Sequence, residues 1–248
     1  MSTRLIDFDY ETGNRFGYGS RMNSIDTFHF LHVVAFALVL VIDMPAFIAA
    51  RRAAEPRAPA GKVLLAAQVM GRTTTLSGLA LIFLLPLGVE IAIDLGVYDL
   101  KAPGWLTATW VVSLAWLALV IAAGRSGTTS LGRRLYTIEI WVRALIGLGN
   151  IYDGAVGVGG DGLVHGDWLA LKILLFGVAL LASAWVRAKM RPVREALAQV
   201  NPLSAQRSNL DERSSTEMLG HLSKVRPGIH SIWLICLIAA WMGLNKSF

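Results

Sequence analysis

The chain has 248 residues, of which 54% are apolar and only 16% are charged. Soluble globular proteins carry about a quarter charged residues, so the composition excludes an ordinary soluble domain and indicates an integral membrane protein. The formal net charge is +6, but the basic residues fall between apolar segments, where membrane topology places them, and we expect no nucleic-acid partner. The one cysteine, Cys236, excludes a disulfide framework.

The apolar segments predict about six membrane spans, because a crossing helix needs about 20 mostly apolar residues. In chain order they cover residues 27–50, 74–95, 105–123, 135–151, 168–186 and 229–244. The predicted fold class is all-α, a polytopic transmembrane helix bundle in a lipid bilayer. The expected parts are a polar outer segment (1–26), a five-span core (27–187), a cytoplasmic loop (188–227), and a sixth span with a short outer tail (228–248).

Basic residues predict the orientation. Sixteen Lys and Arg residues follow the first, third and fifth spans, against five on the other side. The positive-inside rule makes the first side cytoplasmic, so we expect both termini outside. Matching residues 62 and 63 positions apart, Arg72 with Arg134 and Trp105 with Trp168, indicate a weak internal repeat of spans two and three in spans four and five.

Ionisable residues at membrane depth are the main functional signal, because each costs about 2.5–3.5 kcal/mol on insertion scales unless it is paired or solvated. In the first span, His29, His32 and Asp43 share one helix face. In the fourth span, Glu139 and Arg143 have the spacing of an intrahelical ion pair. We expect one polar site in the outer half of the bundle. Its expected members are His29, His32, Glu90, Arg143 and Lys172, with His165 at the rim.

Two histidines one turn apart are candidate ligands of a haem or a metal ion, and His165 is a third candidate metal ligand. Arg143 is too deep to reach the headgroups, so it needs Glu139 or a cofactor carboxylate as partner. The glycine-rich stretch 154–162 lacks the Gly-Lys-Ser/Thr of a phosphate loop. We interpret it as a flexible outer hairpin.

Three motifs resemble one family. The segment LHVVAFALVLVIDMPAFIAAR (31–51) resembles the opening span of the copper-resistance protein D superfamily, which includes the membrane-bound protoporphyrinogen oxidase of many bacteria. Met70-Gly71-Arg72 resembles its Met-x-Arg entry to the second span, with glycine in place of the usual charged residue. The sequence WLALK, ending at Lys172, resembles its Trp-Leu-x-x-Lys motif.

The resemblance implies haem b, with His32 as a ligand, Arg72 and Lys172 in the cofactor site, and a location in the bacterial inner membrane. The oxidase usually has four spans, fewer than we expect here. The leading hypothesis is a haem b-binding protein that passes electrons between a quinone or porphyrinogen and a partner, as an oxidoreductase similar to protoporphyrinogen oxidase. In it His32 is an axial ligand, His29 is the second ligand or a neighbour, and Arg143 and Lys172 pair with the propionates.

Two other functions are compatible with the sequence. Copper uptake or handling would use His29, His32 and Met44, with Asp43 lower in the path, because imidazole and thioether groups bind copper. Alternatively, the chain is an accessory subunit of a larger membrane complex. The 188–227 loop, predicted as an amphipathic helix plus flexible chain, would then dock the partner.

Overall fold

The computed structural model describes residues 15–53, 59–98, 104–160, 162–199 and 212–244. These residues form six helices: α1 (Arg15–Ala53), α2 (Ala60–Asp94), α3 (Trp105–Arg125), α4 (Ser130–Val158), α5 (Asp167–Gln199) and α6 (Glu212–Leu244). All but α4 contain a stretch long and apolar enough to cross a membrane. The predicted all-α class, with several helices able to span a bilayer, is therefore confirmed.

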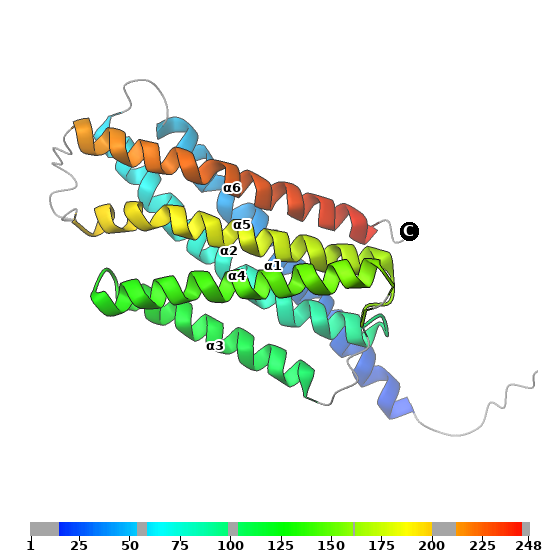
Figure 1. Cartoon of the computed structure of the whole chain (residues 1–248). Coiled ribbons are helices and arrows are strands. Elements are labelled where there is room, and N and C mark those ends of the chain that lie inside the picture. Colours follow the sequence, from blue (N-terminus) through cyan, green and yellow to red (C-terminus); the bar gives the residue numbers. More distant parts are fainter. Residues whose placement is uncertain (1–14, 54–58, 99–103, 161, 200–211, 245–248) are drawn as a thin grey trace, which may run out of the picture.

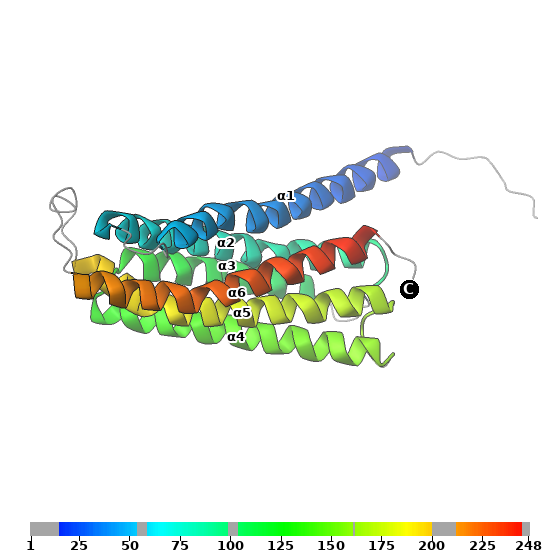
Figure 2. The ribbon, with the colours of Figure 1, turned by 90° about the horizontal axis from the view of Figure 1, so that it is seen from above.

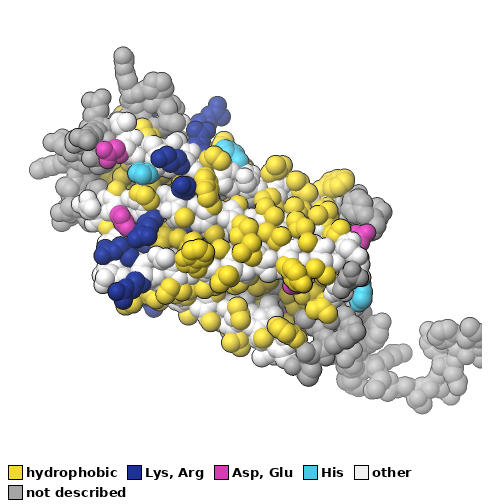
Figure 3. Space-filling view, in the orientation of Figure 1, with side chains coloured by type: hydrophobic (Ala, Val, Ile, Leu, Met, Phe, Trp, Pro, Cys, Tyr) yellow, Lys and Arg dark blue, Asp and Glu magenta, His cyan; other side chains and the backbone are white. Residues whose placement is uncertain are grey.

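The outer surface of the bundle fits a lipid environment. Large apolar side chains are exposed along α1 and α4, including Phe30 (66%), Val41 (65%), Trp141 (65%) and Leu145 (64%). Figure 3 shows apolar side chains over most of one face of the bundle. A soluble monomer rarely exposes so continuous an apolar surface. The chain is thus a multi-pass membrane protein, with these faces toward lipid.

The helices are longer than the predicted spans. Helix α1 begins at Arg15, inside the segment expected to be a polar extension, whereas residues 1–14 lie outside the described part. Within the predicted 188–227 loop, α5 continues to Gln199 and α6 begins at Glu212; residues 200–211 are outside the described part. Hydropathy detects only the portion of a helix that lies in hydrocarbon, and polar turns extend these helices beyond it.

The predicted flexible hairpin over 154–162 is wrong at its beginning, because α4 continues to Val158. Its glycines are packed against α5. A Cβ on Gly154 would lie 2.5 Å from the backbone nitrogen of Leu174, and one on Gly157 would lie 2.9 Å from the Cβ of Ala170. These glycines let two helices approach closely, and only the residues after 158 form the turn.

The helices run alternately up and down, as Figures 1 and 2 show. Helices α1, α3 and α5 end, and α2, α4 and α6 begin, at one end of the bundle. We call this the basic end, because most of the Lys and Arg side chains seen in Figure 3 gather there. The start of α1 and the last residues of α6 lie at the opposite end. Helix α2 packs against α1, α3, α5 and α6, whereas α4 packs mainly on α5.

At the opposite end, the two connections are joined through their backbones. Tyr98 and Val164 form an isolated antiparallel bridge, and the backbone N–H of His165 donates to the carbonyl of Val97 at 2.8 Å. Burial and, secondarily, the nearby charge of Asp153 raise the pKa of the Tyr98 hydroxyl above its ordinary value. The connections after α2 and after α4 are thereby held against each other.

Candidate functional site

Helices α4 and α5 pack closely because glycines face each other. A Cβ on Gly177 would lie 2.5 Å from the carbonyl oxygen of Gly147, and a Cβ on Gly147 would lie 3.0 Å from that of Gly177. Small residues allow such close packing of membrane helices. Because the helices approach so closely, those polar side chains of α4 and α5 that lie nearer the basic end come within hydrogen-bonding distance of each other.

Those side chains form a buried ion network centred on Glu139 of α4, which is 0% exposed. Its Oε1 accepts hydrogen bonds from Arg143 Nε at 2.9 Å and Nη2 at 2.5 Å. Its Oε2 accepts from Nε of Arg187, on α5, at 2.5 Å. One carboxylate therefore pairs with two guanidinium groups, both almost completely buried. We call Glu139, Arg143 and Arg187 the ion network.

Neighbouring polar groups and aromatic rings complete the surroundings of the network. Arg143 Nη1 donates to Ser183 Oγ at 2.8 Å, and its guanidinium lies 5.0 Å from the ring centroid of buried Trp116. The hydroxyl of Tyr136 donates to the carbonyl oxygen of Arg187 at 2.7 Å. Two guanidinium groups contact the same ring, with the Cζ of Arg187 4.6 Å and that of Arg194 4.7 Å from its centroid. Such cation–π contacts stabilise charge away from water.

The expected intrahelical pair of Glu139 and Arg143 is present, but the structure does not bring Arg143 to the histidines. Nε, Nη1 and Nη2 of Arg143 all have partners in the network. Its guanidinium lies against Gly78 of α2, whereas His32 lies against Gly88. Ten helical residues separate those glycines by about 15 Å. Arg143 is therefore a network residue rather than a neighbour of His32.

His32 occupies a separate polar site nearer the opposite end. Its ring lies against the backbone of α2, because a Cβ on Gly88 would be 3.4 Å from its Cε1. Its Nδ1 is buried and has no hydrogen-bond partner among the described residues. The charges of Lys172 and His29 act on the imidazole. We call His29, His32 and Lys172 the histidine site.

Lys172 of α5 lies at this site and packs against α6. Its Nζ lies 5.4 Å from the ring centroid of Trp168. It is also packed against the backbone of α6, since a Cβ on Gly243 would lie 2.6 Å from that nitrogen. Glycines on α2 and α6 therefore face His32 and Lys172, respectively. Larger residues at either position would compete with these side chains for space.

The other predicted site residues lie elsewhere. Glu90 accepts a 2.9 Å hydrogen bond from Nε1 of Trp110, which ties α2 to α3. His165 is exposed in the connection before α5. Arg72 precedes Gly88 by sixteen residues of α2, about 24 Å along the helix, so it is remote from His32. The side chain of Asp43 lies outside the described residues.

The described residues contain no group of three or more His, Cys, Asp and Glu side chains able to hold a metal ion. His29, His32 and His165 accordingly do not form a three-ligand site with one another. The copper site expected from His29, His32 and Met44 stays a prediction. A cofactor held by a single imidazole does not require such a group.

Arg187 was not among the predicted site residues, because it directly follows the fifth predicted span and was counted with the basic residues of the loop after it. The available signal was the spacing of Ser183 and Arg187, four residues apart and hence on one helix face. That face meets α4, where both residues bond to the ion network. Comparison of the chain with protein-family models, curated proteins and solved structures found no match.

Proposed function

We propose that this multi-pass membrane protein binds haem b at the histidine site, with His32 as axial ligand, and transfers electrons between a quinone or porphyrinogen and a partner. The observation that carries the proposal is the buried Nδ1 of His32, which has no partner among the described residues. A buried polar atom normally has a hydrogen-bond partner. An unpartnered imidazole nitrogen at membrane depth therefore favours a ligand that the chain itself does not supply.

One further feature, the charge of Lys172, fits a haem. The ring of His32 packs against the backbone of α2 at Gly88, so a haem would have to reach the imidazole from another side. Lys172 acts electrostatically on His32 and supplies a positive charge for a propionate. Arg143 does not fit the propionate role, because its hydrogen bonds go to Glu139 and Ser183. We accordingly assign Lys172 alone to that role.

His29 would be a neighbour of His32 and not a second ligand. The two residues lie one turn apart on the same helix, so both imidazoles approach from the same side. A bound haem would supply reversible one-electron chemistry, with its potential set by the axial ligand, burial and hydrogen bonding. The residues of this chain would hold it, balance its charge and exclude water. Resemblance to the copper-resistance protein D superfamily, through the motifs at His32 and Lys172, supports the same assignment.

The test is haem content per chain after expression in a haem-sufficient bacterial host. We expect near-unit haem in the unmodified protein, nearly complete loss in His32→Ala, and partial loss in Lys172→Met. His230→Ala is the matched control, because His230 is exposed on α6 and its ring packs edge-on against Phe47. Equal haem in His32→Ala and His230→Ala, with both variants folded, would refute His32 as the ligand.

One observation favours a second function, an accessory subunit of a membrane complex. The most extensive polar cluster described, the ion network, is enclosed and internally paired, as expected of a structural element. Under this alternative the purified protein is colourless, and His32→Ala leaves its assembly state unchanged. Affinity capture from membranes would then recover a constant partner chain.

A further inference from the structure

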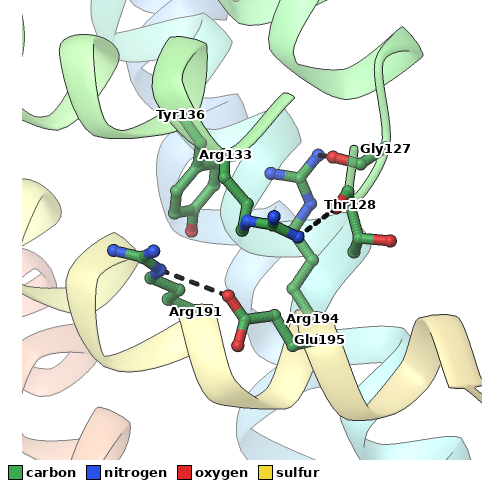
Figure 4. A pocket seen from close by; sticks show the side chains of 7 residues that line it. All are labelled: Gly127, Thr128, Arg133, Tyr136, Arg191, Arg194 and Glu195. Carbon is green, nitrogen blue, oxygen red and sulfur yellow. Dashed lines mark hydrogen bonds and ion pairs between the residues drawn. The ribbon is translucent and has the colours of Figure 1, made fainter. Parts of the chain in front are cut away.

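A shallow pocket lies at the basic end, between the connection from α3 to α4 and the last turns of α5. Its enclosed volume is only about 10 Å³, so it is an open depression in the surface rather than a cavity. Figure 4 shows arginine side chains reaching this space from both helices: Arg133 from α4, and Arg191 and Arg194 from α5. The ring of Tyr136 and the carboxylate of Glu195 complete the lining with the connection's backbone. We call this the arginine pocket.

Arg194 is fixed in place by the end of α3. Its Nη2 donates to the carbonyl oxygens of Ala123 at 2.6 Å and Gly127 at 2.7 Å. The last carbonyls of a helix have no partner within the helix, so this guanidinium satisfies one of them and holds the connection. Its plane also lies over the ring of Tyr136. Arg194 is thereby a preorganised positive charge in the pocket.

The pocket has more positive charge and more donors than the chain uses. Each guanidinium carries five N–H donors. In the described hydrogen bonds Arg133 uses one, to the carbonyl of Thr128 at 2.7 Å, and Arg191 uses one, to Glu195 at 3.3 Å. Both partners of the second pair are about half exposed, which makes it a weak pair. The lining thus contains three guanidinium groups and one carboxylate, and the excess of positive charge favours an oxyanion.

The level of the pocket relative to the membrane favours a lipid as its ligand. Helix α3 has 21 residues, or about 32 Å, close to the ~30 Å thickness of the hydrocarbon core. Residues that directly follow α3 therefore lie at the level of the headgroups. Basic pockets between helices at this level bind the headgroups of anionic lipids, and arginine forks match phosphate oxygens.

We infer that the arginine pocket binds the phosphate of an anionic phospholipid. Arg133 lines it from α4, and Arg191 and Arg194 line it from α5. Through Tyr136, which touches both Arg194 and Arg187, an occupied pocket also stabilises the packing of α4 on α5. This inference does not depend on the histidine site.

The experiment measures the thermal unfolding midpoint of the whole detergent-purified chain against increasing phosphatidylglycerol, with phosphatidylcholine and inorganic phosphate as parallel arms. We expect saturable stabilisation by phosphatidylglycerol alone. Arg133→Gln and Arg191→Gln should each weaken it about tenfold, since a hydrogen bond to a charged group contributes that much. Both side chains are exposed, so the variants should fold. The matched control is Arg134→Gln, which removes an exposed charge from the next position of α4, outside the pocket lining.

Four results would overturn the inference. They are equal stabilisation by phosphatidylcholine, equal weakening in Arg134→Gln, unchanged affinity in both pocket variants, and equal stabilisation by inorganic phosphate, which would identify a free anion as the ligand. For Glu195→Gln we expect the opposite change in the affinity for phosphatidylglycerol. Removing the one carboxylate of the pocket should strengthen the binding of phosphatidylglycerol severalfold, and a weakening would contradict the assignment.

Discussion

Arg187 of α5 donates a 2.5 Å hydrogen bond to Glu139 of α4, and the two side chains are 7% and 0% exposed. The same carboxylate also holds Arg143, so one negative charge pairs with two positive ones away from water and the network keeps a net charge of +1. Removing one partner of a buried pair is far more costly than never having had the pair, because it leaves an uncompensated charge. The network is therefore a determinant of how α4 sits on α5.

Glu139→Gln should destabilise the protein by about 3–5 kcal/mol, because it leaves two buried guanidinium groups without a counter-charge. Arg187→Gln should cost less, since the neutral pair of Glu139 and Arg143 remains. The measurement is the free energy of unfolding in mixed detergent micelles. Glu195→Gln, at an exposed pair, is the control and should cost less than about 1 kcal/mol. A Glu139→Gln cost as small as that of the control would contradict the network's role.

Gly177→Ala should destabilise the α4–α5 contact by about 1–3 kcal/mol, since the new methyl group would overlap the backbone of Gly147. Gly149→Ala is a matched control on α4. A Cβ there meets nothing within 4 Å, so the change should be neutral or stabilise the helix by about 0.5–1 kcal/mol. Unfolding of both variants under identical conditions distinguishes a packing effect from helix propensity. Equal effects of the two substitutions would refute the close contact.

Arg194→Gln should loosen the end of α3, because the carbonyls of Ala123 and Gly127 lose the guanidinium that binds them. We expect faster amide hydrogen exchange over residues 124–129 and little change in α6. Arg194→Lys should rescue only part of the protection, since an ammonium group lacks the planar fork of arginine. Unchanged exchange in Arg194→Gln would show that the connection is held by other contacts.

The orientation is testable with single cysteines. Cys236→Ala removes the one native cysteine, after which Thr128→Cys reports on the basic end and Leu163→Cys on the opposite end. The positive-inside rule predicts that a membrane-impermeant maleimide labels Leu163→Cys in whole cells and Thr128→Cys only after permeabilisation. The reverse pattern would invert the topology and place the histidine site in the cytoplasmic half of the membrane.

The sequence predicted where the helices lie along the chain far better than it predicted which residues meet between helices. For α3, the predicted start coincides with the observed one at Trp105, because both ends are set by an abrupt change of hydropathy. For α6, the prediction began at residue 229 whereas the helix begins at Glu212, since its first turns are polar and hydropathy does not detect them. Helix periodicity correctly put Glu139 and Arg143 on one face.

Periodicity does not show which helix a face meets, and this explains the errors in the site. Arg143 was grouped with His32 on depth alone, but the face that carries it packs against Ser183 and Gly78. Arg187 was counted with the loop after the fifth span, and its partner, Glu139, is 48 positions away in the sequence. The grouping of His29, His32 and Lys172 stays a prediction, although the charges of Lys172 and His29 do act on His32.

The most direct test of the proposed function is a reduced-minus-oxidised visible spectrum of the purified protein, together with a pyridine haemochrome assay. Haem b at the histidine site predicts a Soret band and a sharp α band with near-unit stoichiometry, and loss of both in His32→Ala. A protein that is folded, monodisperse and colourless after expression with ample haem would contradict the proposal and leave the accessory-subunit function in its place.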